Sequence, residues 1–116
     1  HRALMTKWIQ DNPPADGVGW SPYPLSLRIV NWIQYALAGG TLDERALQSL
    51  AVQARFLARS VEWHLLGNPI LANAKALLFA GAFFRGEEAN GFVRRGVTIL
   101  LFYPWKRYGC ARRGAA

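Results

Sequence analysis

The sequence contains only one cysteine and two histidines among its 116 residues, and this scarcity excludes several kinds of site. Because Cys110 has no second cysteine to pair with, an intrachain disulfide is impossible and the redox compartment stays open. His1 and His64 cannot form a zinc-type ligand cluster, so we expect no bound metal. The sequence also lacks a phosphate-binding glycine loop and paired carboxylates at a helix corner. We therefore predict no cofactor.

The sequence also has no apolar run long enough to predict a membrane span. The longest run lies near residues 70–84, and Asn73 and Lys75 interrupt it. We therefore expect no membrane insertion. The N-terminus shows neither a signal peptide nor an initiator methionine, which is typical of a segment from a longer protein. The missing signal peptide consequently carries no information about export.

Acidic residues are sparse, since seven Asp and Glu oppose fourteen Lys and Arg and leave a formal net charge of +7. The excess is unevenly placed. Residues 102–116 contain no acid but hold Lys106, Arg107, Arg112 and Arg113. A basic balance is typical of proteins that bind nucleic acid, a membrane surface or an acidic polymer. Because so much of this charge is confined to the tail, it is weak evidence about the rest of the chain, and we predict no nucleic-acid partner.

Apolar and aromatic residues, in contrast, are abundant. Hydrophobic residues make up 52% of the chain and include five Trp and six Phe, so the composition excludes a disordered protein. The length fits one small domain with its own core. Trp20, Trp32 and Trp63 are the right type of side chain for sugar platforms, but core packing is the favoured interpretation for most of them.

Helical periodicity dominates the chain, and no strand alternation competes with it. Five helices are expected: over residues 2–10, 25–37 and 42–65, and two more that begin at Pro69 and after Gly86. The helix over residues 42–65 is predicted to be the longest, with Thr41 as its cap and Glu44 completing a capping box. The sequence thus predicts an all-α fold of antiparallel helical hairpins with no sheet, either a bundle or a layered toroid or solenoid.

The helical pattern stops near residue 101. Residues 102–116 show neither helical periodicity nor capping residues. We therefore expect one helical domain over residues 1–101, followed by a basic tail over residues 102–116 that is disordered.

Two polar residues lie at the corner between the third and fourth predicted helices. Asn68 is either a simple helix cap before Pro69 or an amide that binds a substrate carboxylate. His64 is either satisfied near the end of its helix or acts as a proton-transfer group. In both cases the structural interpretation is the commoner one for these residue types.

A second group of candidates lies on one face of the second predicted helix. Arg28, Asn31 and Tyr35 are spaced three and four residues apart, so they lie side by side. Because arginine binds carboxylates with two parallel hydrogen bonds, this face is suited to an acidic sugar. A solvated helix face is an equally good interpretation.

Two motifs carry a resemblance to a known family. Residues 19–33, GWSPYPLSLRIVNWI, resemble the W-x-P-Y-P-x-S-x-R-x-x-N-W motif of heparinase II/III-type proteins. Residues 64–77, HLLGNPILANAKAL, resemble the same family's H-L-x-G-N-H-x-x-A-N-x-K-A-L segment. The two motifs occur in the same order as in the family, and the resemblance covers most of residues 1–100.

The resemblance implies part of the N-terminal (α/α) toroid domain of a polysaccharide lyase, related also to alginate lyases. Such enzymes cleave heparin-like, heparan-sulfate-like or alginate-like polysaccharides, which contain uronic acids, by β-elimination. Family members carry a further β-sandwich domain and are bacterial periplasmic or secreted proteins. An acidic polysaccharide is therefore the implied partner, and the oligomeric state is left open.

The resemblance also assigns roles to individual residues. Asn68 corresponds to the residue that neutralises the substrate carboxylate, and His64 is a further catalytic candidate. The implied substrate-binding residues are Arg28, Asn31, Tyr35 and Asn73. Donors held ready at a developing negative charge are a strong catalytic device.

The chain departs from the family at two places. Pro69 replaces the family's histidine, and the segment that supplies the catalytic tyrosine has no counterpart, since Tyr103 and Tyr108 do not match it. We therefore predict a lyase fragment that is inactive by itself. The alternative is a non-catalytic helical module that binds carbohydrate or another protein.

Overall fold

The structure is a computed structural model, and it describes residues 2–14, 17–61 and 68–115. Five α-helices and one short 3₁₀ helix follow each other along the chain: α1 (Arg2–Asp11), η1 (Val18–Trp20), α2 (Pro22–Leu37), α3 (Glu44–Arg59), α4 (Asn68–Phe83) and α5 (Glu87–Ala115). No strand occurs among the described residues, so the all-α prediction is confirmed.

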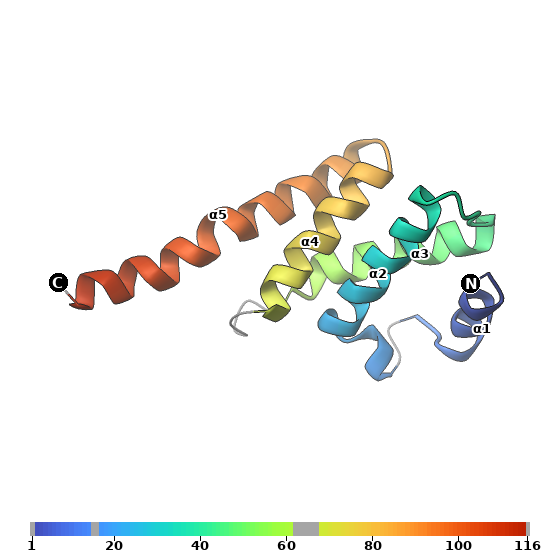
Figure 1. Cartoon of the computed structure of the whole chain (residues 1–116), viewed down its shortest axis with the longest axis horizontal. Helices are drawn as coiled ribbons and strands as arrows, with labels where there is room; N and C mark the ends of the chain where they lie inside the picture. Colours follow the sequence, from blue (N-terminus) through green and yellow to red (C-terminus); the bar gives the residue numbers. More distant parts are fainter. Residues whose placement is uncertain (1, 15–16, 62–67, 116) are drawn as a thin grey trace.

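Helix α4 lies at the centre of the fold (Figure 1). It packs most extensively against α5 and α2, and α3 packs across both α2 and α4. Helices α2 and α4 run in the same direction, while α5 returns beside α4 in the opposite direction. Helix α1 packs against α3 at the far side of the molecule, so the two chain termini lie at opposite ends.

The core consists of aliphatic side chains from four helices, which meet around α4. The residues that are fully or almost fully buried include Leu25, Ile29, Ile33, Leu50, Leu57, Ile70, Leu77 and Ile99. Those on α2 and α3 occupy the apolar stripes expected from their helical spacing. Burying each such side chain stabilises the fold by about 1.5–3 kcal/mol, so this cluster supplies most of the driving force.

Two glycines allow α4 and α5 to approach closely. A Cβ atom on Gly81 would lie 2.9 Å from the carbonyl oxygen of Ala89 and would also collide with Val93. A Cβ atom on Gly96 would lie 2.9 Å from Cγ of Leu78 and 3.1 Å from the carbonyl oxygen of Ala74. The backbone at each glycine therefore lies directly against atoms of the partner helix. A larger residue at either position must push the two helices apart.

Helix α3 begins and ends at other residues than predicted. Asp43 is its N-cap, and the carboxylate accepts a hydrogen bond from the backbone N–H of Ala46 at 2.8 Å, so the capping box assigned to Thr41 is wrong. At the other end the hydroxyl of Ser60 donates to the carbonyl of Phe56 at 2.6 Å, and α3 stops at Arg59. The longest helix is α5, with 29 residues, and not the one predicted over residues 42–65.

Helix α5 also includes most of the segment in which the sequence shows no helical periodicity. Helix α5 continues through residues 102–115, and its C-terminal half projects away from the other helices (Figure 1). Because the first part of α5 is already formed against α4, each added residue except Pro104, which has no backbone N–H, gains a helical hydrogen bond without a new nucleation step. Helical propagation of this kind needs no periodic apolar face, which is why the side-chain pattern did not predict it.

Candidate functional site

The candidate site is a groove of about 630 Å³ between α1 and α2. Its lining combines aliphatic, aromatic and amide side chains: Leu4, Met5, Trp8, Asn31, Trp32, Gln34 and Tyr35. Asn31 and Tyr35 were predicted as substrate-binding residues from the sequence, and the structure places both in this groove. Pockets with an apolar and aromatic lining and a few polar groups are typical sites for small organic ligands.

Helix α2 positions the polar side of the groove. Asn31, Gln34 and Tyr35 share one face because they are three or four residues apart. Asn31 and Gln34 are exposed, whereas Tyr35 is half-buried. The ring of Tyr35 lies against Gly40, where a Cβ atom would collide with it, and the N–H of Gly40 bonds to the Tyr35 carbonyl at 2.9 Å. The chain reversal after α2 thus leaves space for the Tyr35 ring.

Helix α1 contributes the aromatic wall through Trp8. The Trp8 ring stands perpendicular to Trp32 with centroids 5.7 Å apart, and it lies 5.8 Å from Trp20. Trp20 and Trp32 are buried, as the core interpretation predicted, while Trp63 lies outside the described residues. Perpendicular aromatic pairs of this kind add to the stability gained from burial. The wall is therefore a fixed part of the packing between α1 and α2.

Arg28 does not line the groove but lies beside the same aromatic wall. Its guanidinium carbon is 3.8 Å from the centroid of the Trp8 ring. Nε donates to Oε1 of Gln53 at 2.9 Å, and Nη2 donates to the carbonyl of Gly19 at 2.5 Å. Two of its N–H groups are thus already bound to the protein, so Arg28 joins α1, η1, α2 and α3 in addition to any contact with a ligand.

The surroundings of Arg28 are unusual for a cation. Burial lowers its pKa to about 10, so the side chain still carries its charge at neutral pH. Among the described residues Arg28 has no carboxylate partner, in contrast to Arg55, which pairs with Glu88 at 2.6 Å. Gln53 is fully buried and extends this hydrogen-bond network, because its Nε2 donates to Oγ of Ser49 at 3.1 Å. The charge of Arg28 is therefore stabilised by amide, carbonyl and ring contacts.

The predicted residues of the corner before α4 are separate from the groove. Asn68 begins α4, in agreement with its predicted place at a helix start, but its side chain and all of His64 lie outside the described part of the chain. Asn73 is fully buried within α4, which contributes no residue to the groove lining. The assembly of Arg28, Asn31 and Asn68 into one substrate-binding face therefore remains a prediction.

Three residues of the site were missed from the sequence. Trp8 and Gln34 were not among the site residues predicted from the sequence. Gln53 could have been found from the sequence, because it is a polar residue between Leu50 and Leu57 on the buried stripe of α3. A glutamine at such a position needs hydrogen-bond partners, and the nearest candidates on neighbouring helices include Arg28.

The described residues hold no other obvious centre of chemistry. In residues 2–14, 17–61 and 68–115, no three His, Cys, Asp or Glu side chains lie close enough to bind a metal ion together. Within the same ranges, none of the helices combines the length and apolar character needed to cross a bilayer. Tyr35 is the single ionisable side chain among the residues that line the groove.

Comparison of the chain with protein-family models, with curated proteins and with solved structures finds no match. The resemblance to heparinase II/III-type proteins accordingly rests on the two sequence motifs. The groove and the Arg28 network rest on the geometry of the structure alone. Function must therefore be argued from these two sources together.

Proposed function

We propose that the groove between α1 and α2 binds uronic-acid units of an acidic polysaccharide, and that the chain is a helical, toroid-type part of a polysaccharide lyase. The observation that carries the proposal is the groove lining, in which Trp8, Trp32 and Tyr35 stand beside the amides of Asn31 and Gln34. The two heparinase-like motifs support it independently, since the first of them contains Asn31 and Trp32.

The chemistry of the lining suits a sugar. Aromatic rings offer flat apolar surfaces for the C–H faces of a pyranose, and amides both donate to and accept from its hydroxyl groups. The groove volume of about 630 Å³ leaves space for a short stretch of sugar units. Arg28 places a positive charge against the ring of Trp8, and this charge favours an anionic ligand beside the aromatic wall.

Binding without cleavage follows from the groups that the groove lacks. In β-elimination the substrate carboxylate is neutralised, a base removes the C5 proton, and an acid donates to the leaving O4 atom. Among the lining residues the amides serve the first step, and Tyr35 is the only group able to transfer a proton. A second proton-transfer group is missing from this lining, so we expect the chain to bind and not to cleave.

The test measures binding and product together. The chain is titrated with alginate, heparan sulfate, hyaluronan and neutral dextran by calorimetry, while absorbance at the wavelength of the unsaturated product is followed. Asn31→Ala combined with Gln34→Ala removes both amides and should weaken binding of the preferred acidic polymer about tenfold. The control is Asn90→Ala, which removes an exposed amide on α5 and should leave binding unchanged.

Each outcome bears on one part of the proposal. Equal affinity of the double variant and the control would place the sugar site away from the groove. Equal binding of dextran would contradict the preference for acidic sugars. Formation of unsaturated product that disappears in Tyr35→Phe would contradict the absence of cleavage.

A further inference from the structure

The positive charge of the chain is concentrated on α5. Residues 1–88 carry eight Lys or Arg and seven Asp or Glu, so they are almost neutral. Residues 89–116 contain no acid at all, and their basic residues are Arg94, Arg95, Lys106, Arg107, Arg112 and Arg113. The part of α5 that follows Glu88 therefore carries six positive charges, while the two acidic residues of the helix lie in its first turn.

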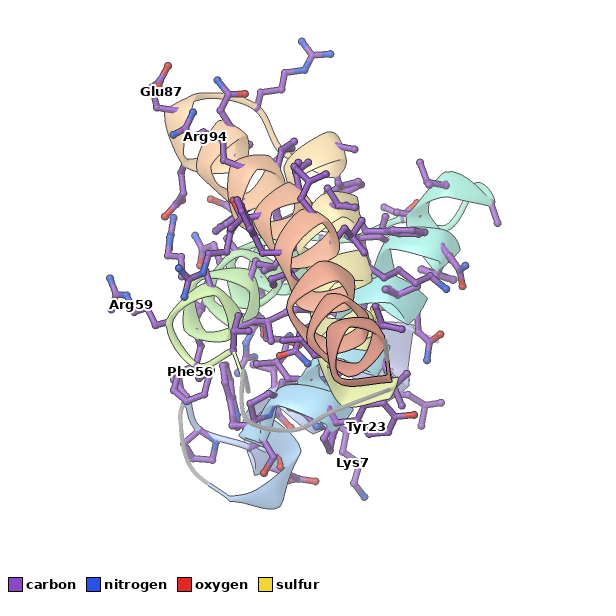
Figure 2. The ribbon with its side chains drawn as sticks, turned by 90° about the vertical axis from the view of Figure 1, so that its left-hand side faces the viewer. Lys7, Tyr23, Phe56, Arg59, Glu87 and Arg94 are labelled. Carbon is purple, nitrogen blue, oxygen red and sulfur yellow. The ribbon has the colours of Figure 1, made fainter. Side chains whose placement is uncertain are left out.

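The geometry of α5 separates this charge from the rest of the fold. The first half of the helix packs against α4 through Gly96 and Ile99, and the second half extends beyond the other helices (Figure 1). Figure 2, seen along α5 from its C-terminal end, shows the same projection with the other helices behind it. The acidic residues nearest in sequence, Glu87 and Glu88, lie at the opposite end of α5.

Large apolar side chains are exposed where the projection begins. The exposed fractions are 40% for Val97, 41% for Leu100, 55% for Leu101 and 53% for Phe102. Val97, Leu100 and Leu101 share one face of the helix because they are spaced three and four residues apart. A contiguous apolar face of this kind marks an interaction surface.

We propose that the projecting half of α5 binds an anionic lipid surface, lying along the interface with its apolar face in the headgroup and acyl boundary. This inference does not depend on the groove or on the lyase resemblance. Interfacial helices combine Lys and Arg with Trp, Phe and Leu, and residues 97–108 contain all five of these residue types. Binding along the surface does not require the helix to cross the bilayer.

The apolar side chains decide between a lipid surface and a nucleic acid. Both are polyanions and would attract the six basic residues. Leu100 and Leu101, however, have aliphatic side chains, which gain little against phosphates and sugars but leave water on entering the acyl boundary. The combination of positive charge with exposed leucine therefore favours the lipid surface.

The test uses the intact chain with two kinds of vesicle, phosphatidylcholine alone and phosphatidylcholine mixed with phosphatidylglycerol. Sedimentation should show binding only to the vesicles with phosphatidylglycerol, and added salt should weaken it. Lys106→Gln combined with Arg107→Gln should reduce the partition coefficient about twenty-five-fold, since each basic side chain near the surface contributes about a factor of five. The control, Arg45→Gln combined with Arg59→Gln, removes two exposed charges from α3, on which Arg59 points outward (Figure 2).

A second pair of variants tests the apolar face. Leu100→Ala combined with Leu101→Ala should reduce partitioning about tenfold. Leu27→Ala combined with Leu37→Ala removes two exposed leucines from α2 and should have no effect. Equal binding to both vesicle types, no loss in either α5 variant, or retention of duplex DNA without retention of vesicles would each overturn the proposal.

Discussion

Helix pairs α4–α5 and α1–α2 show two different ways of joining helices. The seam between α4 and α5 is apolar and close, and Gly81 and Gly96 lie where no side chain fits. The junction of α1 with α2 rests on the rings of Trp8 and Trp32, and a groove with amides at its edge remains open beside them. The first pair serves as a scaffold, and the second leaves a surface that a ligand can reach.

The contrast shows where sequence changes should be tolerated. Along the α4–α5 seam a methyl group added at Gly81 or Gly96 does not fit, because atoms of the partner helix, including backbone atoms, occupy the space. Around the groove the side chains meet at ring edges and hydrogen bonds, so substitutions there should change binding more than folding. Four predictions test this contrast, in order of decreasing effect.

The largest effect is expected for Gly81→Ala. The new Cβ atom would lie 2.9 Å from the Ala89 carbonyl oxygen, so α5 must shift, and we expect a loss of about 2 kcal/mol in the free energy of unfolding. Gly91→Ala is the matched control, because its Cβ atom would meet only Nη2 of Arg94 at 3.8 Å. Alanine favours the helix there and should add up to about 1 kcal/mol. Equal stabilities in urea unfolding would show that the seam is not close-packed.

The second prediction concerns the network behind the groove. Gln53→Ala leaves Nε of Arg28 without its buried acceptor, and we expect a loss of about 1.5 kcal/mol in urea unfolding. Gln48→Ala changes an exposed glutamine on the same helix and should stay within about 0.5 kcal/mol of the parent. If the two variants were equally stable, Arg28 would not depend on Gln53.

The third prediction concerns the ring at the edge of the groove. Gly40→Ala places a methyl group against Tyr35, so the ring must move, at a cost of about 1 kcal/mol in the free energy of unfolding. In the background of Tyr35→Ala the same substitution should be close to neutral, because the collision is gone. A cost that persists in that background would come from the backbone at Gly40.

The smallest effect is expected at the exposed ion pair of Arg55 with Glu88. The hydrogen bond from Arg55 lowers the pKa of Glu88 below its ordinary value of 4.5. The pair therefore stabilises the fold above this value, and the stabilisation is lost as the pH falls through the lowered pKa. Because both side chains are exposed, Glu88→Gln should cost at most about 0.5 kcal/mol at neutral pH and nothing in strong acid. Glu87→Gln, without an ion pair among the described residues, should show no such pH dependence.

Much of the fold was predictable from the sequence. The starts of α1 and α5, the glycines after α2 and the buried stripe with Leu50 and Leu57 follow from local spacing and capping residues. The start of α3 was misplaced because Thr41 and Asp43 are both good caps, and local preference alone does not choose between them. The extension of α5 through residues 102–115 was not predicted, because these residues show neither helical periodicity nor capping residues.

The site was only partly predictable for a different reason. Asn31 and Tyr35 were found because they share a face of one helix, which spacing reveals. The role of Trp8 and the turning of Arg28 toward Gln53 depend on how α1 and α3 pack against α2. Packing between helices far apart in sequence is a tertiary property, so no local sequence pattern could predict these contacts.

The central claim, that the groove between α1 and α2 holds an acidic sugar, is tested most directly by two-dimensional amide NMR. Uronic-acid oligosaccharides are titrated into the labelled chain while the side-chain amides of Asn31 and Gln34 and the indole N–H of Trp8 are followed. The account predicts that these three signals shift together with one saturation curve, while the side-chain amide of Asn90 on α5 stays in place. Shifts confined to α5, or no shift at the groove at saturating sugar, would contradict it.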